Sequence, residues 1–163
     1  MEKRKKYLDR IIELIPVTML WMVIIAMAAV MFCGMAEGSP RYPANLWKGL
    51  LGEAIGDGPE GMTAVCHVYK NRLNKGMRLG CVALKRKSLN KFIAEQLAYG
   101  RRIGRDYKKE AKNIINKVFR GESKDPTGGA LFYENIEIFG VPYWAKDMVV
   151  TTKLKSHTFY KRR

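Results

Sequence analysis

The sequence contains few residues of the kinds that build metal centres or disulfide frameworks. It has three cysteines and two histidines in 163 residues. Three cysteines exclude a disulfide-dense mini-protein, and the pairing of Cys66 with Cys81 stays open. His67 and His157 lie too far apart in the sequence for metal-ligand spacing, and no phosphate-binding glycine loop or nucleophile elbow occurs. We therefore expect neither a bound metal ion nor a cofactor.

Acidic residues are scarce compared with basic ones. The chain has 30 Lys and Arg residues against 15 Asp and Glu residues, so its formal net charge is +15 at pH 7. Apolar residues make up 47% and aromatic residues 10% of the chain, which excludes a disordered or low-complexity protein. A charge this basic favours a polyanionic partner, namely nucleic acid, an anionic membrane surface or an acidic wall polymer.

The longest uncharged stretch extends from Leu14 to Met35. As a helix it would span roughly 33 Å, and the hydrocarbon core of a bilayer is about 30 Å thick. Basic residues precede it and few charges follow it directly, so the positive-inside rule places the N-terminus in the cytoplasm. A buried helix and a cleaved signal peptide are the alternatives. Because signal-peptide cores usually have only about 7–15 apolar residues, we expect an uncleaved transmembrane anchor.

This segment divides the chain into a cytoplasmic basic tail (1–13), the transmembrane anchor (14–35), a linker (36–44) and a domain (45–163). We expect a single-pass protein of the inner (cytoplasmic) membrane whose domain faces the periplasm or another extracytoplasmic space. Residues 36–163 hold 25 basic and 12 acidic residues, a net charge of +13. Because this charge lies on the exported side, we expect the membrane but no nucleic acid as a partner. The sequence predicts no particular oligomeric state.

The exported domain has a helical pattern followed by a short β-prone part. Apolar residues at helical spacing, the capping residues Asn45 and Asp106, and the stop residues Gly76 and Gly121 predict the helices. The predicted elements are helices at 45–54, 59–76, from about 88 and at 106–121, a turn at 125–129, and strands at 131–133 and 157–160. We expect a mostly helical α+β domain of about 120 residues, which is large enough to bury a core without disulfides.

One acidic residue, Glu53, is a candidate catalytic group because of its position. It lies near the end of an apolar helix and directly before the glycine-rich turn Gly56–Pro59. A carboxyl group in such a place is partly desolvated, and desolvation favours the neutral form that can donate a proton. The alternative is a solvated surface glutamate, which is the more usual role at a helix end. Cys66 lies on an apolar helical stripe, which indicates packing rather than catalysis.

Four segments occur in an order that resembles one enzyme family. They are GEAIGDGPEGMTAVCHVYKNRL at 52–73, Cys81-Val82, DPTGGALFYEN at 125–135 and SHTFY at 156–160. Together they resemble the SleB-type cell wall hydrolases, which include spore-cortex-lytic enzymes and their phage and bacterial relatives. The resemblance covers roughly residues 46–160. It implies a lysozyme-like α+β fold and cleavage of the bond between N-acetylmuramic acid and N-acetylglucosamine in peptidoglycan.

The resemblance places the family's catalytic glutamate on Glu53. In the lytic transglycosylase mechanism that it implies, this glutamate first protonates the glycosidic oxygen and then accepts a proton from the muramyl 6-hydroxyl. A single carboxyl group therefore suffices. A lysozyme-type hydrolase with water as acceptor and a non-catalytic module that binds peptidoglycan are the alternatives. All three have the same partner, the glycan strands of peptidoglycan.

Five further residues are candidate substrate contacts: Glu60, Thr127, Tyr133, Asn135 and His157. Glu60 matches a family glutamate, and the turn that contains Thr127 is expected to shape one wall of the groove. Tyr133 and Asn135 suit stacking on a sugar and hydrogen bonding to an N-acetyl group. Structural alternatives exist for four of them. Glu60 is alternatively a favourable first-turn carboxylate, and His157 a buried, hydrogen-bonded histidine. Tyr133 and Asn135 are alternatively the packed and exposed positions of a strand.

Overall fold

The computed structural model describes residues 21–22 and 42–163. The chain divides into two units, residues 1–41 and residues 42–163. No helix in the described ranges is long and apolar enough to cross a membrane. Apart from Trp21 and Met22, the predicted tail and anchor lie outside the described residues, so both stay predictions.

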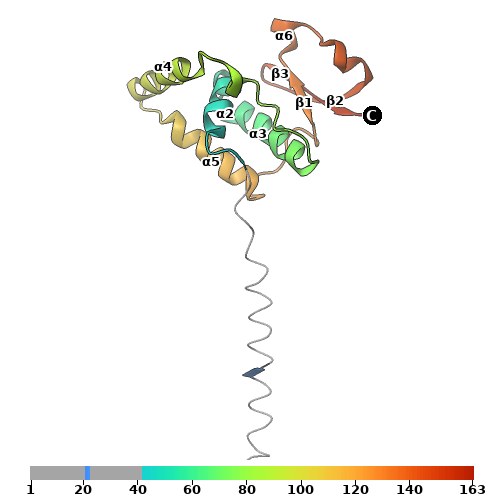
Figure 1. The fold of residues 1–163 in the computed structure, drawn as a ribbon, viewed down its shortest axis with the longest axis horizontal. Helices are drawn as coiled ribbons and strands as arrows, with labels where there is room; N and C mark the ends of the chain where they lie inside the picture. Colours follow the sequence, from blue (N-terminus) through green and yellow to red (C-terminus); the bar gives the residue numbers. More distant parts are fainter. Residues whose placement is uncertain (1–20, 23–41) are drawn as a thin grey trace, which may run out of the picture. The chain divides into compact units, whose positions relative to one another are not determined.

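A short apolar helix, α2 (Leu46–Ala54), forms the centre of the helical part. Its side chains Leu46, Leu50 and Leu51 are fully buried, and three longer helices pack around it (Figure 1). The other elements here are α3 (Gly58–Asn74), α4 (Leu89–Arg102), α5 (Tyr107–Phe119), and the 3-10 turns η1 (Ile55–Asp57) and η2 (Ala83–Lys85). Buried residues of these four helices belong to one core cluster.

The helix boundaries follow the signals in the sequence. Pro59 lies in the first turn of α3, where its missing N–H leaves no bond unmade, and Gly76 follows the helix with a φ of 66°. At the start of α5, the Asp106 side chain accepts a hydrogen bond from the Lys109 N–H at 3.0 Å. Asn45 occupies the N-cap position of α2, but its side chain makes no cap bond. The predicted helices are thus confirmed.

The last part of the chain forms a three-stranded antiparallel sheet with the order β1-β3-β2. Its elements are β1 (Phe132–Glu134), α6 (Ile136–Phe139), η3 (Tyr143–Asp147), β2 (Met148–Leu154) and β3 (His157–Arg162). The predicted strands near 131–133 and 157–160 are confirmed. β2 has no counterpart among the predicted strands, although its run of Val and Thr is typical of one. A mostly helical domain with a small sheet confirms the α+β class.

The inner face of the sheet packs against α3 through aromatic rings. The ring of Tyr133 contacts that of His157 with a centroid distance of 5.1 Å, and Tyr69 of α3 meets Tyr133 edge-on at 6.4 Å. Successive residues of a strand point to opposite faces of the sheet. Phe132 and Glu134 therefore lie on the outer face, opposite to Tyr133.

The predicted turn before β1 is organised around the carboxylate of Asp125. Its Oδ1 accepts bonds from the Thr127 N–H at 2.7 Å and the Thr127 hydroxyl at 2.6 Å, and its Oδ2 accepts the Gly129 N–H at 3.1 Å. Asn71, near the end of α3, donates from Nδ2 to Asp125 Oδ2 at 2.9 Å and to the Ala130 carbonyl at 3.2 Å. These bonds fix the start of β1 against α3.

His67 lies buried beside this turn. Its Nδ1 is 3.9 Å from Asp125 Oδ1, and its Nε2 is 3.1 Å from the Ser123 hydroxyl. Burial lowers the pKa of His67 below its ordinary value of 6.5, against the opposing effect of the Asp125 carboxylate. Burial alone would raise the pKa of Asp125, but hydrogen bonds from Thr127 and Asn71 bring it below its ordinary value of 3.8. In acid, both groups therefore bind fewer protons in the folded protein than in the unfolded chain.

We expect the Thr127 hydroxyl to be necessary for stability. Thr127 is fully buried, and its hydroxyl also accepts the Ala130 N–H at 3.3 Å. Thr127→Val keeps the shape and the backbone bond to Asp125 but leaves the Ala130 N–H without its acceptor, so it should lower the free energy of unfolding by about 1–3 kcal/mol. The control Thr127→Ser keeps the hydroxyl and should lose less. Urea denaturation measures both, and a Val variant as stable as the Ser variant would contradict this role.

We also expect stability to fall in two steps as the pH is lowered. The unfolded chain protonates His67 near its ordinary pKa of 6.5, whereas the folded state resists protonation, so the free energy of unfolding should decrease below that pH. Protonation of Asp125 should cause a second decrease below its ordinary pKa of 3.8. Urea denaturation across this range should reveal a smaller first step in His67→Gln. An unchanged first step would exclude His67 as its source.

Candidate active site

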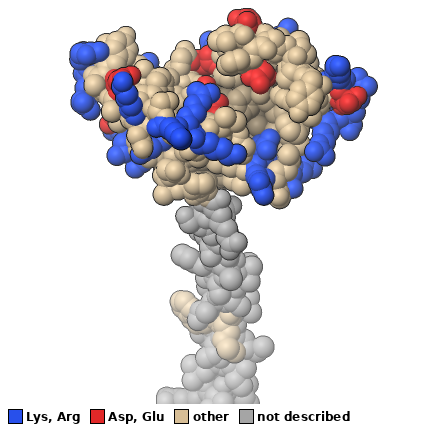
Figure 2. Space-filling model, turned by 45° about the horizontal axis from the view of Figure 1, so that its top comes forward, with Lys and Arg blue, Asp and Glu red and all other residues tan. Residues whose placement is uncertain are grey.

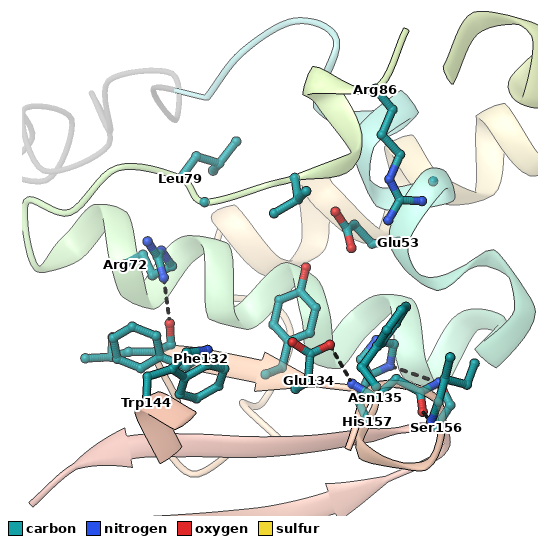
Figure 3. A pocket seen from close by; sticks show the side chains of 17 residues that line it. Glu53, Arg72, Leu79, Arg86, Phe132, Glu134, Asn135, Trp144, Ser156 and His157 are labelled. Atoms are coloured by element: carbon teal, nitrogen blue, oxygen red, sulfur yellow. Dashed lines mark hydrogen bonds between the residues drawn. The ribbon is translucent and has the colours of Figure 1, made fainter. Parts of the chain in front are cut away.

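A groove with a volume of about 640 Å³ opens between the end of α2, the segment around η2, and β1, which is an edge strand of the sheet (Figure 3). α6, η3 and the turn between β2 and β3 also contribute residues to its walls. These parts are far apart in the sequence, so only the fold brings them together. The groove holds two carboxylates, an imidazole, two guanidinium groups and several aromatic rings.

Glu53 projects into this groove from the last turn of α2. It is half-buried, and its Oε1 accepts the Ala83 N–H at 2.5 Å. The Tyr133 hydroxyl is a second polar group next to this carboxyl group. The carboxyl group is therefore fixed at one oxygen by the Ala83 N–H and lies in the groove beside a phenol.

Two glycines of α2 let the segment around η2 approach Glu53 this closely. A Cβ atom on Gly52 would lie 2.8 Å from Ala83 Cβ and 2.8 Å from Leu89 Cδ1. A Cβ atom on Gly49 would lie 2.5 Å from Cys81 Sγ. Such contacts are too short for carbon atoms, so any side chain at these positions would push η2 away from α2. The absence of side chains on this face of α2 thus brings the Ala83 N–H within reach of Glu53.

Two tyrosines lie beside Glu53. The Tyr69 and Tyr133 hydroxyls are 3.1 Å apart. Burial raises the pKa of Tyr133 well above 10.0, and the negative charge of Glu53 adds to the increase. Burial also raises the pKa of Tyr69, with Tyr133, Cys81 and Glu53 adding to it. Both phenols therefore stay protonated at neutral pH and can donate hydrogen bonds next to the carboxylate.

His157 is held by Asp57, a residue 100 positions earlier in the chain. Its Nδ1 is 2.7 Å from Asp57 Oδ2, and Ser156 donates from its hydroxyl to the same oxygen at 2.8 Å. Gly61 makes room for Asp57, since a Cβ atom there would collide with Asp57 Cβ. This pair fixes the imidazole ring with Nδ1 towards Asp57. Nε2 has no bond to any described residue, and His157 lines the groove.

The second carboxylate of the groove belongs to Glu134, which was not among the predicted site residues. Its Oε1 accepts the Asn135 N–H at 3.1 Å. In the sequence, its position between the predicted contacts Tyr133 and Asn135 is the feature that could have indicated a place in the groove. Alternation along a strand places it on the face opposite to Tyr133, and it reaches the groove only because β1 is an edge strand.

The structure places three of the five predicted substrate contacts in the groove and two outside it. Tyr133, Asn135 and His157 line it, and the Asn135 side chain also caps α6 by accepting the Ile138 N–H at 3.2 Å. Thr127 does not line the groove, since it is fully buried in the Asp125 turn. Glu60 is exposed outside the groove, where its carboxylate lies 2.9 Å from Lys155 Nζ.

The cysteines of the domain take no part in this groove's chemistry. Cys66 and Cys81 are both buried free thiols. Burial raises the pKa of Cys66 to about 12 and also raises that of Cys81, so neither is a ready nucleophile. Among the described residues, no group of three or more His, Cys, Asp or Glu side chains could hold a metal ion.

A comparison with known protein families identifies the domain. Residues 56–160, more than half of the chain, match the family described as Cell Wall Hydrolase. The match contains Tyr133, Asn135 and His157 and begins three residues after Glu53. No curated protein and no solved structure matches the chain, so the lysozyme-like character of the fold stays a prediction. The resemblance to the SleB type is confirmed: the chain belongs to the cell wall hydrolase family, and its domain is a peptidoglycan-degrading enzyme.

Proposed function

We propose that this protein is a membrane-anchored lytic transglycosylase that cleaves the bond between N-acetylmuramic acid and N-acetylglucosamine. The observation that carries the proposal is the Glu53 carboxyl group in the groove of a cell wall hydrolase domain. One of its oxygens accepts the Ala83 N–H, and the Tyr133 hydroxyl lies beside the carboxyl group. A carboxyl group held in this way suits the role of a general acid in glycosidic cleavage.

In the first step, Glu53 Oε2 donates its proton to the glycosidic oxygen. The bond between this oxygen and C1 of the muramic acid breaks, the N-acetylglucosamine leaves as an alcohol, and positive charge develops at C1. Glu53 changes from neutral to negative in this step. The hydrogen bond from the Ala83 N–H strengthens as negative charge develops on Oε1, so it stabilises the transition state more than the ground state.

In the second step, the 6-hydroxyl group of the same muramic acid attacks C1. Its proton passes to Glu53, which now acts as a base, and a 1,6-anhydro ring closes. Glu53 ends the cycle protonated, as it began. No water molecule takes part, so this reaction needs no second carboxylate.

The remaining groove residues bind and orient the glycan in this proposal. Asn135 Nδ2 and His157 Nε2 hydrogen-bond polar groups of the sugars, and the ring of Trp144 offers a flat face for stacking. Tyr133 is packed between other rings, so its hydroxyl supports Glu53 rather than stacking on sugar. Glu60 and Thr127 act through the fold.

The predicted anchor at 14–35 completes the proposal. Its uncharged length and the basic residues before it support a single-pass helix with the N-terminus in the cytoplasm. The domain would then lie on the side of the membrane where peptidoglycan is found. A tether of this kind keeps the enzyme close to its substrate.

We expect Glu53→Gln to lower the rate of muropeptide release from purified sacculi by about 10²–10⁴-fold, because general acid catalysis contributes that much. The Gln side chain can still accept the Ala83 N–H, so the fold should be retained. Glu95→Gln, a matched change on an exposed glutamate of α4, should leave release near the wild-type rate. Full activity of Glu53→Gln would refute the assignment.

A lysozyme-type hydrolase is the second candidate, because Glu134 lies in the same groove. A second carboxylate can activate a water molecule, which a hydrolase requires and a transglycosylase does not. The two reactions leave different ends on the muramic acid.

We expect mass spectrometry of the released muropeptides to detect 1,6-anhydro ends, and Glu134→Gln to leave both product and rate nearly unchanged. Hydrated reducing ends, together with a loss of activity in Glu134→Gln, would instead establish the hydrolase.

A further inference from the structure

The positive charge of the domain is concentrated away from the groove. Residues 85–120, which contain α4 and α5, hold 12 basic and 3 acidic residues. They thus account for +9 of the charge, and of these basic residues only Arg86 lines the groove. Figure 2 shows Lys and Arg side chains in several groups across the visible face of the domain. Charge that lies outside the groove does not serve catalysis directly.

Three lysines on one side of α5 have no acidic partner among the described residues. They are Lys108, Lys109 and Lys112, all of them exposed. The nearest acidic side chains in the sequence are already engaged. Glu110 forms a pair with Arg105 at 2.8 Å, and Asp106 caps the helix. The ammonium groups of this face are therefore available to an external anion.

Aromatic side chains border the same face. Lys108 Nζ lies 5.2 Å from the centre of the Trp47 ring. The Nζ of Lys48, the residue after Trp47, lies 5.8 Å from the same ring centre. Tyr42 and Lys112 line a shallow pocket together with Trp47. Lysines next to Trp and Tyr form the combination that proteins place at the level of lipid headgroups. We name the set Trp47, Lys108, Lys109 and Lys112 the α5 face.

The chain enters the domain at this face. Tyr42 donates from its hydroxyl to Asn116 Oδ1 at 3.0 Å, and its ring lies 4.6 Å from that of Phe119. Both partners are on α5. The predicted membrane segment ends at residue 35, and the seven chain steps to Tyr42 span at most about 25 Å when fully extended. A tethered domain would therefore keep α5 close to the membrane surface.

We propose that the α5 face docks on anionic phospholipid headgroups and thereby orients the domain on the membrane. The inference rests on the proposed anchor, but not on the proposed reaction. None of the α5-face residues lines the groove, so docking leaves the groove open to glycan. Each lysine near an anionic surface strengthens the association roughly fivefold, and salt weakens it.

The test uses the full chain reconstituted into vesicles of phosphatidylcholine alone or mixed with phosphatidylglycerol. A membrane-impermeant reagent acetylates accessible lysines, and mass spectrometry gives the rate at each one. We expect Lys108, Lys109 and Lys112 to react at least about fivefold more slowly in the anionic vesicles, and to recover in high salt. Lys146 in η3 and Lys153 in β2 are exposed and do not belong to the α5 face. They should react at the same rate in both types of vesicle.

Two triple variants with the same change in net charge provide the control. Lys108→Glu, Lys109→Glu and Lys112→Glu together should abolish the protection of Lys48, which lies beside Trp47, in anionic vesicles. Lys146→Glu, Lys153→Glu and Lys161→Glu together should leave that protection intact. Equal loss in both variants would mean that only net charge matters and would overturn the assignment of this face.

The remaining outcomes of the acetylation experiment also test the docking proposal. Equal reactivity in the two vesicle types, whether fast or slow, would overturn the proposal, because charge recognition requires a difference. Protection that appears only when an anionic wall polymer is added would replace the phospholipid with that partner. A chain that stays in the supernatant of both vesicle types would overturn the anchor and the docking together. Muropeptide release from the same preparations tests the proposed reaction separately.

Discussion

The hydrogen bond from the Ala83 N–H to Glu53 Oε1 is the interaction on which the groove depends. It joins the end of a buried helix to a segment 30 residues further along the chain, and it holds the carboxyl group that would otherwise rotate freely. The bond is possible because Gly52 has no side chain to keep α2 and η2 apart. Close packing in the core thus determines the direction of a polar group at the surface. The close contact between α2 and η2 therefore also fixes the direction of the Glu53 carboxyl group.

The opposite wall of the groove is fixed by α3. Near its end, Asn71 binds the Asp125 turn and the start of β1. Two residues earlier on α3, Tyr69 meets Tyr133 on β1. Because α3 also packs against α2, the positions of both walls of the groove depend on α3. The stability of the Asp125 turn and the geometry around Glu53 are therefore coupled, although the turn itself does not line the groove.

The charges of the domain are divided by position. The groove combines Glu53 and Glu134 with Arg72 and Arg86, so it has no strong excess of one sign. Much of the basic excess lies in residues 85–120, which hold 12 basic and 3 acidic residues. A groove without excess charge can accept a largely uncharged glycan backbone, while a separate basic surface can serve adhesion. The overall charge of +15 thus does not describe the charge of the groove.

Local patterns in the sequence were enough to predict the helices, the Asp125 turn and two of the three strands, because caps, glycine stops and apolar spacing act within a few residues. The order of four motifs predicted the family, and the resemblance assigned Glu53, Tyr133, Asn135 and His157 to one site. Contacts between distant segments decided the rest. The sequence could not place Asp57 beside His157, bring Glu134 over an edge strand, or bury Thr127 away from the groove, since each depends on how α3 and the sheet pack. The sequence by itself therefore determined the chemical groups of this enzyme, and the tertiary structure decided which of them line the groove.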